Sequence, residues 1–414
     1  AAPVVAGVFA PGFMRDPEKF ALTADLIRVT FPYLLLISMT GLCGAILNSY
    51  GRFAVPAFTP VLLNLSLIGA ATLAAPGFAE PAFALAWGVA FAGLVQLLFQ
   101  LPFLYRLDLV PRPRWDIRHP GVRRILRLMV PALFGVSVSQ INLLLDTVLA
   151  SFLPTGSVSW LYYSDRLTEL PLGVFGIAIA TVILPSLSAD QSAARGERFA
   201  LTLDWAVRGV LLIAVPATVA LVMLAKPILI TLFQYGALSP HDVSMAAYSL
   251  RAYALGLCAY MLIKVLAPGF YARKDMMTPV SIGIRAMLAN MVLNVLFVVP
   301  LLFYFNLGHV GLALATSVAA YLNAMLLWRG LLRESVYRFS PAWRAYAGRL
   351  SLATLAMLAV LLSLGTPVDT WLAWSWAQRS LQLSLICGAG GVTYVLVHAL
   401  TGTRLHHLRT PRSE

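Results

Sequence analysis

Long apolar stretches of about 20 residues follow one another along almost the whole chain. A helix of that length crosses the ~30 Å hydrocarbon core of a bilayer, and it satisfies its backbone hydrogen bonds without water. Only 11% of the 414 residues are charged and 60% are hydrophobic, whereas a soluble domain carries about 25% charged residues. The sequence therefore predicts an all-α polytopic membrane protein.

Eleven complete spans can be delimited from the hydropathy pattern, and residues 1–10 look like the end of a further span cut off upstream. The complete spans cover about 26–48, 54–76, 82–105, 128–153, 158–187, 205–233, 244–268, 278–302, 308–330, 345–365 and 380–401.

Basic residues fall on one side of this layout. The loops on that side are 49–53, 106–127, 188–204, 269–277, 329–344 and the tail 402–414. The loops on the other side contain no Lys or Arg, and they are 77–81, 154–157, 235–243, 303–307 and 366–378. This alternation predicts that the linker 106–127 and the C-terminus are cytoplasmic. The net charge of +13 is then explained by membrane topology, and no nucleic-acid partner is expected.

Two exterior features complete the predicted topology. Loop 11–25 carries both basic and acidic residues and is the one mixed external loop. Trp371, Trp374 and Trp376 are expected to lie in the outer interfacial belt, where amphipathic aromatic rings gather.

Residues 26–61 and 249–280 share an internal pattern. Each segment runs from an Arg near the outer start of a span to a cytoplasmic Tyr-x-Arg, and then to the Thr-Pro-Val that opens the next span. Parallel repeats are typical of duplicated transporters, so we expect two pseudo-symmetric helical lobes. The expected parts are the remainder of the first lobe in 1–105, the linker 106–127, the second lobe in 128–330, and two extra helices with a basic tail in 331–414. The first half is short, so the intact protein would have 14 spans, with two to three helices preceding this chain.

Three charges, Asp165, Arg166 and Glu169, stand beside one of the most apolar runs of the chain. A charge at mid-bilayer costs about 3 kcal/mol even on lenient insertion scales. On a helix, Asp165 and Glu169 share a face, and Arg166 lies three residues from Glu169. We expect Arg166 to point into a water-filled central cavity, braced by one or both carboxylates, because a guanidinium offers paired donors to a phosphate. The alternative is that the helix starts at Leu170 and leaves the charges in the outer interface.

Asp146 is the only charge in the run VSQINLLLDTVLASFL. Asn290 and Asn294 lie one helical turn apart and could offer amide oxygens, and Thr316 could offer a hydroxyl. Oxygen ligands of this kind suit a hard cation such as Na⁺. The alternative is that Asp146 pairs with a neighbouring Arg or Lys, and that the two Asn side chains join helices by hydrogen bonds.

Lys264 and Arg285 also lie within spans. Lys264 is near the cytoplasmic end, where its side chain can reach the interface, and Arg285 lies one to two turns into its span, so both are candidates for contact with an anionic substrate. The sequence contains no P-loop, no HExxH motif and no extramembrane domain that could build an active site. The chain is therefore not expected to be an enzyme.

Four segments closely resemble the MurJ (MviN) family of lipid II flippases, and the resemblance covers essentially the whole chain. They are GAILNSYGRFAVPAFTPVLLN (44–64), GVSVSQINLLLDTVLASFLPTGSVSWLYYSDRLTELPLGVFG (135–176), LFQYG (232–236) and KVLAPGFYARKDMMTP (264–279). The resemblance implies the fold of the MOP exporter superfamily, with two six-helix lobes around a central cavity and two further C-terminal helices. Those two helices would be 345–365 and 380–401, and they are thought to form a groove for a lipid tail.

The resemblance also implies a function. Family members move lipid II, the undecaprenyl-diphosphate-linked peptidoglycan precursor, from the cytoplasmic to the periplasmic leaflet of the inner membrane by alternating access. Arg166 matches a cavity arginine of the family, and Asp165 and Glu169 match its acidic neighbours. A sodium site described for some members matches Asp146, Asn290 and Asn294, and less directly Thr316, so the resemblance implies Na⁺ as the one candidate cofactor, in the role of coupling ion. Other essential arginines of the family belong to the first two helices.

Lipid II and membrane lipids are therefore the expected partners, together with proteins of peptidoglycan synthesis and division. Another transporter of the superfamily, either a multidrug/cation antiporter or an O-antigen-type polysaccharide flippase, is the main alternative. A cation exporter should favour a cavity dominated by carboxylates, whereas Arg166 favours an anionic head group. A second alternative is a membrane enzyme such as a polyprenyl-phosphate glycosyltransferase, which would need an acidic catalytic motif in a longer loop. A third alternative is a non-transporting scaffold of the division machinery, which would not need the charges within its spans.

Overall fold

The structure is a computed structural model that describes residues 2–109, 120–193, 196–334, 336–337 and 342–402. The described residues form helices and no strand, which confirms the all-α prediction. Nine helical segments in the described part of the chain are long and apolar enough to cross a membrane. Helix α6 (Pro120–Ser151) and the pair α7 (Ser157–Pro171) and α8 (Ile177–Ser192) are not among those nine. The count of eleven spans therefore stays a prediction.

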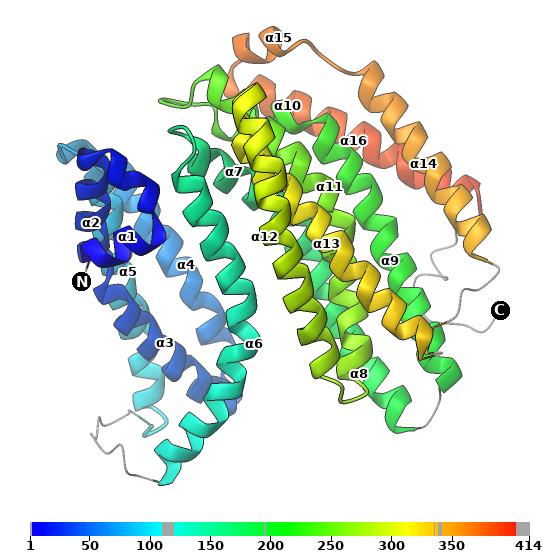
Figure 1. The fold of residues 1–414 in the computed structure, drawn as a ribbon, viewed down its shortest axis with the longest axis horizontal. Helices are drawn as coiled ribbons and strands as arrows, with labels where there is room; N and C mark the ends of the chain where they lie inside the picture. Colours follow the sequence, from blue (N-terminus) through cyan, green and yellow to red (C-terminus); the bar gives the residue numbers. More distant parts are fainter. Residues whose placement is uncertain (1, 110–119, 194–195, 335, 338–341, 403–414) are drawn as a thin grey trace. The chain divides into compact units, whose positions relative to one another are not determined.

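The chain divides into two compact units, Ala1–Leu133 and Phe134–Glu414, and α6 begins in the first and ends in the second. Within the first unit, α5 packs against α2, α3 and α4 (Figure 1). The amide nitrogen of Gln100 on α5 donates to the Thr59 hydroxyl on α4 over 2.9 Å, a polar link of the kind that joins helices in lipid. Helix α1 is short and lies at the N-terminal end of this unit. The bounds are α1 (Ala2–Phe9), α2 (Pro17–Thr30), α3 (Pro32–Ser49), α4 (Ala54–Gly69) and α5 (Pro81–Tyr105).

The second unit is built around α11, which packs against α7, α8, α9, α10 and α13 (Figure 1). Helix α12 packs mainly against α13, and α14 packs against α16 and α9. The bounds are α9 (Gly196–Met223), α10 (Ala225–Phe233), α11 (Pro240–Tyr271), α12 (Met277–Phe305), α13 (Gly308–Arg333), α14 (Trp343–Ser363), α15 (Val368–Ala373) and α16 (Trp376–Leu400). Helix α11 is the most buried of the candidate spans, so it forms the centre of the second unit.

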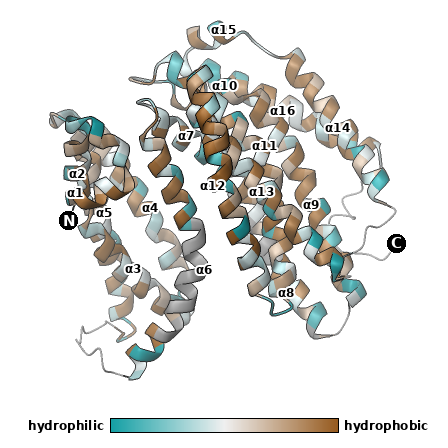
Figure 2. Ribbon diagram, in the orientation of Figure 1, coloured by the Kyte–Doolittle hydropathy of each residue, from teal (hydrophilic) through white to brown (hydrophobic). Residues whose placement is uncertain are grey.

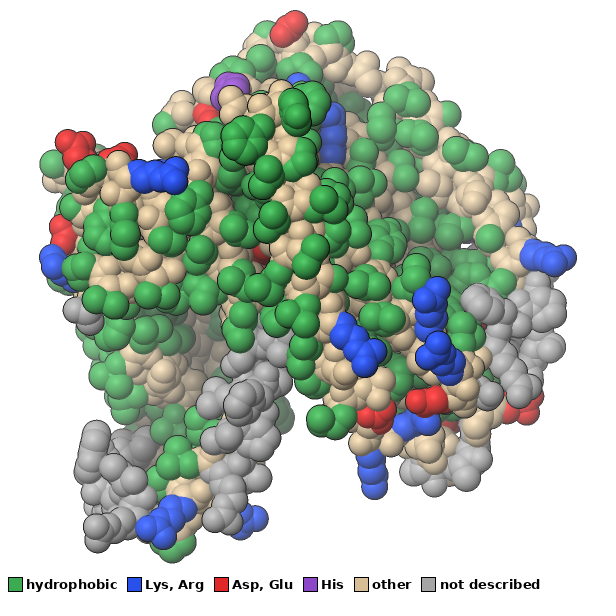
Figure 3. Space-filling view, in the orientation of Figure 1, with side chains coloured by type: hydrophobic (Ala, Val, Ile, Leu, Met, Phe, Trp, Pro, Cys, Tyr) green, Lys and Arg blue, Asp and Glu red, His purple; other side chains and the backbone are tan. Residues whose placement is uncertain are grey.

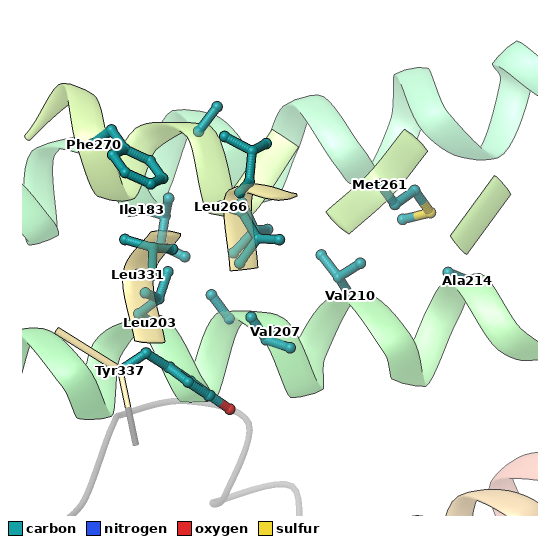
Figure 4. Close-up of a cluster of buried hydrophobic side chains, with 14 of the residues drawn as sticks. Ile183, Leu203, Val207, Val210, Ala214, Met261, Leu266, Phe270, Leu331 and Tyr337 are labelled. Atoms are coloured by element: carbon teal, nitrogen blue, oxygen red, sulfur yellow. The ribbon is translucent and has the colours of Figure 1, made fainter. Parts of the chain in front are cut away.

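The largest hydrophobic core lies in the second unit, where side chains of α8, α9, α11 and α13 meet (Figure 4). Leu203 and Val207 of α9, Phe270 of α11 and Leu331 of α13 are nearly inaccessible to solvent. Large apolar side chains also cover the outer helix faces of this unit, and Lys and Arg gather near its lower end (Figures 2 and 3). An apolar exterior over a packed interior is expected of helices that face lipid.

Two predicted spans are interrupted. The predicted span 205–233 is divided at Leu224 between α9 and α10. Pro227 has no N–H to bond to the Met223 carbonyl, which favours a break in the helix there. The guanidinium of Arg251 donates to the Val222 carbonyl over 3.2 Å and satisfies an oxygen near the break. The predicted span 158–187 contains a π-helical turn, Leu172–Gly176, between α7 and α8.

Two expectations about the exterior were wrong. Residues 11–25 are not an open loop, because a 3₁₀ turn over Pro11–Arg15 is followed by α2, whose first turn is capped by the Asp16 carboxylate. Trp371 does not lie in an exposed belt, since its side chain is fully buried on α15 in a hydrophobic core that also includes residues of α10, α14 and α16. Loop composition alone did not reveal that α15 folds back onto the unit. Trp376, by contrast, is 65% exposed.

Candidate functional site

Asp165, Arg166 and Glu169 all lie on α7. The helix begins at Ser157, so the alternative in which it starts only at Leu170 is wrong. A nitrogen of the Arg166 guanidinium lies 2.5 Å from a carboxylate oxygen of Glu169, and the side chains are 55% and 51% exposed. The Arg166 guanidinium also lies 5.0 Å from the centre of the Tyr162 ring, one turn earlier. Two neighbours on the same helix therefore fix the orientation of an accessible guanidinium.

Asp165 differs from Glu169. Its side chain is only partly exposed, and no ion pair between it and Arg166 is formed. Of the two predicted braces for Arg166, Glu169 is the one that pairs with it.

The π-helical turn Leu172–Gly176 begins directly after Pro171, the last residue of α7. Such turns widen a helix locally and occur frequently at functional sites. It places a change of helical geometry within two turns of Arg166.

The structure brings the predicted residues around Asp146 together from three helices. The amide nitrogen of Asn294 on α12 donates to one carboxylate oxygen of Asp146 over 2.7 Å. The Thr316 hydroxyl on α13 lies 3.5 Å from the other oxygen. The amide of Asn290 links the two partners, since it accepts from Asn294 over 3.0 Å and donates to Thr316 over 3.4 Å.

Asn142, which sequence reasoning missed, completes this cluster. Its amide nitrogen donates to Asp146 over 3.3 Å from one turn earlier on α6. The spacing of four residues was the available signal, because residues i and i+4 share a helix face. We call Asn142, Asp146, Asn290, Asn294 and Thr316 the Asp146 cluster. Within the part of the chain that the structure describes, no Arg or Lys pairs with Asp146.

Two oxygens of the Asp146 cluster are buried without a hydrogen-bond donor among the described residues: the side-chain carbonyl oxygens of Asn142 and Asn294. A buried acceptor without a donor costs about 1–3 kcal/mol, so such atoms need a reason. The set contains one carboxylate, amide oxygens and a hydroxyl, which are ligands that hard cations prefer. The residues present therefore fit a monovalent cation. No group of three or more His, Cys, Asp or Glu that could hold a metal is found among the described residues.

Lys264 on α11 and Arg285 on α12 are both exposed. In the described ranges neither forms an ion pair with the α7 charges or with any other residue. Their proposed contact with substrate stays a prediction.

Comparison with known proteins gives one consistent family. The sequence profile described as "Lipid II flippase MurJ" matches residues 1–381. A protein of Vibrio cholerae named "Probable lipid II flippase MurJ" is 51% identical over 412 residues, which cover 98% of this chain and 77% of that protein. A protein of the same name from Haemophilus influenzae is 45% identical, with 99% of this chain and 81% of that protein covered.

Solved structures agree in fold. The structure titled "Lipid II flippase MurJ, inward closed conformation" superposes with a TM-score of 0.78 and 25% identity, covering 95% of this chain and 77% of that one. An inward-facing MATE family multidrug transporter of the MOP superfamily superposes with a TM-score of 0.63 and 19% identity, covering 81% of this chain and 77% of that one. The second likeness shows a shared fold, which confirms the predicted MOP-type architecture.

Proposed function

Because this chain belongs to the lipid II flippase MurJ family, we propose that it carries lipid II across the membrane by alternating access, with Arg166 as a contact for the diphosphate. The chain is a multi-pass membrane protein, and we place it in the bacterial inner membrane with its basic loops in the cytoplasm. The activity moves a lipid and needs no covalent chemistry. The observation that supports the role of Arg166 most directly is its half-exposed guanidinium on a helix that is otherwise next to apolar sequence.

The geometry of Arg166 suits an anionic head group. A guanidinium has five N–H donors in a rigid plane, and the Glu169 pair occupies only one edge of it. The remaining donors can bond to phosphate oxygens with paired geometry. Glu169 and Tyr162 hold the group in place before the lipid arrives, which reduces the entropy lost on binding.

The experiment compares two arginines that each form an exposed ion pair three residues apart on a helix. Arg28 on α2 forms an exposed i, i+3 pair with Asp25 at 2.5 Å, as Arg166 does with Glu169. We expect Arg166→Ala in the full-length protein to abolish exposure of lipid II on the outer leaflet of cells that depend on it, whereas Arg28→Ala leaves exposure unchanged. Normal exposure in Arg166→Ala cells with normal protein levels would remove Arg166 from the mechanism.

We further propose that the Asp146 cluster binds Na⁺ as a coupling ion. The support is the Asp146 carboxylate with the amides of Asn142 and Asn294 beside it, each of which has a buried side-chain oxygen without a donor among the described residues. A bound cation would offset the carboxylate charge, whose burial is otherwise costly. Rotation of the Asn294 amide would exchange its nitrogen for its oxygen beside Asp146, so the same residues can serve the ion-free and ion-bound states.

This site has its own test. We expect Asp146→Ala to remove the dependence of lipid II transport on Na⁺. Unchanged dependence would argue against the site while leaving the role of Arg166 intact.

A further inference from the structure

A pocket of about 420 Å³ opens within the second unit between α11, α12 and α13. It extends from Tyr271 and Pro279, near the α11–α12 turn, to Asn290 and Thr316 of the Asp146 cluster. At about 1.5 Å per helical residue, the interval from Pro279 to Asn290 spans roughly 16 Å along α12. Its volume has room for on the order of ten water molecules.

The lining of the pocket is largely apolar, and the polar side chains that it contains among the described residues carry no charge. Asn323 and the hydroxyl-bearing Tyr260 and Tyr271 line it together with small residues such as Gly283 and Ala320. Neutral oxygens can replace part of the water shell of a cation without holding it as a carboxylate would. A wall of this kind permits passage.

The inner end of the pocket coincides with the Asp146 cluster. Asn142, Asn290 and Thr316 line the pocket, and each is hydrogen-bonded within the cluster. An ion that reaches this end is therefore separated from the carboxylate by a single layer of side chains.

The other end of the pocket, beside the α11–α12 turn, does not repel a cation. The α11–α12 turn carries Arg273, Lys274 and Asp275. Arg273 is paired with Glu334 at the end of α13, and the Asp275 carboxylate lies on the same turn, where it accepts a hydrogen bond from the Thr278 N–H. Two basic and two acidic groups thus leave the entrance close to neutral.

We propose that this pocket is the route by which Na⁺ reaches and leaves the Asp146 cluster from the side of the α11–α12 turn, the predicted cytoplasmic side. The inference rests on the cation site proposed above and adds its path. The route lies wholly within the second unit, so ion exchange with that side needs only α11, α12, α13 and the end of α6.

Gly283 offers a precise way to block the path. It lines the pocket, and a Cβ built on it meets nothing within 4 Å. A Leu at this position would extend into open space without moving the backbone, and Leu also favours the helix over Gly. Gly388 on α16 is exposed and equally unobstructed, so Gly388→Leu is the matched control.

The test uses the full-length protein purified in detergent. Sodium NMR line broadening gives the exchange rate, and Na⁺-dependent thermal stabilisation gives the equilibrium affinity. We expect Gly283→Leu to slow exchange about tenfold or more with unchanged affinity, because an obstructed path raises the barrier and leaves the bound state alone. Gly388→Leu should exchange at the wild-type rate. Asn323→Leu, which removes a polar group from the pocket lining, should also slow exchange, and it replaces Gly283→Leu as the test if that variant folds poorly.

The outcomes separate the route from the site. If Asp146→Asn abolishes Na⁺ binding while both pocket variants exchange at the wild-type rate, the route is overturned and the site stands. If Asp146→Asn binds Na⁺ as the wild type does, the site and the route both fall. A pocket variant that loses affinity at an unchanged association rate would also overturn the route, since the pocket would then be part of the binding site.

Discussion

Gly311 on α13 lies directly against the backbone of α12, and this contact supports the prediction that we develop first. A Cβ on Gly311 would lie 2.8 Å from Val298 Cα and 2.9 Å from the Phe297 carbonyl carbon. These are backbone atoms, which cannot rotate aside as a flexible side chain could. Ala315 and Ala319 continue the small face at intervals of four residues and are buried, as in other closely packed membrane helix pairs.

The expected effect of Gly311→Ala follows from two opposed terms. Replacing Gly by Ala inside a helix stabilises it by about 1 kcal/mol. Inserting an atom into a closed contact costs about 1–3 kcal/mol, and the rigid backbone at Val298 favours the upper part of that range. We therefore expect Gly311→Ala to lower the free energy of unfolding by roughly 1–2 kcal/mol. Gly348 on α14 has nothing within 4 Å, so Gly348→Ala should raise it by up to ~1 kcal/mol.

The assay is unfolding of the purified protein by denaturing detergent in mixed micelles. The separation of α12 from α13 should also lengthen the 3.4 Å contact between Asn290 and Thr316, so Gly311→Ala should weaken Na⁺ binding as well. A Gly311→Ala variant as stable as Gly348→Ala would refute the reasoning, because it would mean that the two backbones can separate without cost.

Two further predictions concern polar side chains of the second unit. Asp204 pairs with Arg208 at 2.6 Å and accepts from the Tyr337 hydroxyl at 2.5 Å. Asp204→Ala should therefore destabilise the protein by about 3 kcal/mol in the same unfolding assay. A loss of stability within error of zero would exclude these contacts as the anchor of the α13–α14 connection. Hydrogen bonds from the side chain and the backbone N–H of Thr278 lower the pKa of Asp275. The ionised carboxylate therefore adds up to about 1 kcal/mol to the free energy of unfolding. This stabilisation is present above the ordinary carboxyl pKa of about 3.9 and is lost as pH falls through the lowered pKa. The stabilities of wild type and Asp275→Asn should therefore differ at neutral pH and converge in acid, and a difference that persists in acid would contradict this assignment.

Much of the fold could be predicted because the bilayer leaves few choices. Apolar runs of sufficient length must become helices, since no other open segment satisfies its backbone in lipid. The same logic singled out Asp146, because a lone carboxylate in an apolar run requires polar partners. Asn290 and Asn294 were identifiable as partners by their shared helix face, although they lie far from Asp146 in sequence.

The remaining features depend on contacts that a linear pattern does not encode. Sequence spacing allowed Arg166 to pair with Asp165, Glu169 or both, and only the three-dimensional structure distinguishes the two carboxylates. The sequence pattern does not single out Arg379, yet its buried guanidinium donates to the carbonyl oxygens of Trp371 and Ile230, and so joins α16 to α15 and α10. The burial of Trp371 follows from that docking.

The central claim is that Arg166 contacts the diphosphate of the lipid, and binding measures this most directly. The affinity of the purified full-length protein for lipid II should fall about ten- to hundredfold in Arg166→Ala, because a charge-assisted hydrogen bond contributes about 1.5–3 kcal/mol. Arg166→Lys should retain part of the affinity, since it keeps the charge but loses the planar fork. A polyprenyl lipid with an uncharged head group should bind wild type and Arg166→Ala equally. Equal affinity of wild type and Arg166→Ala for lipid II itself would contradict the account.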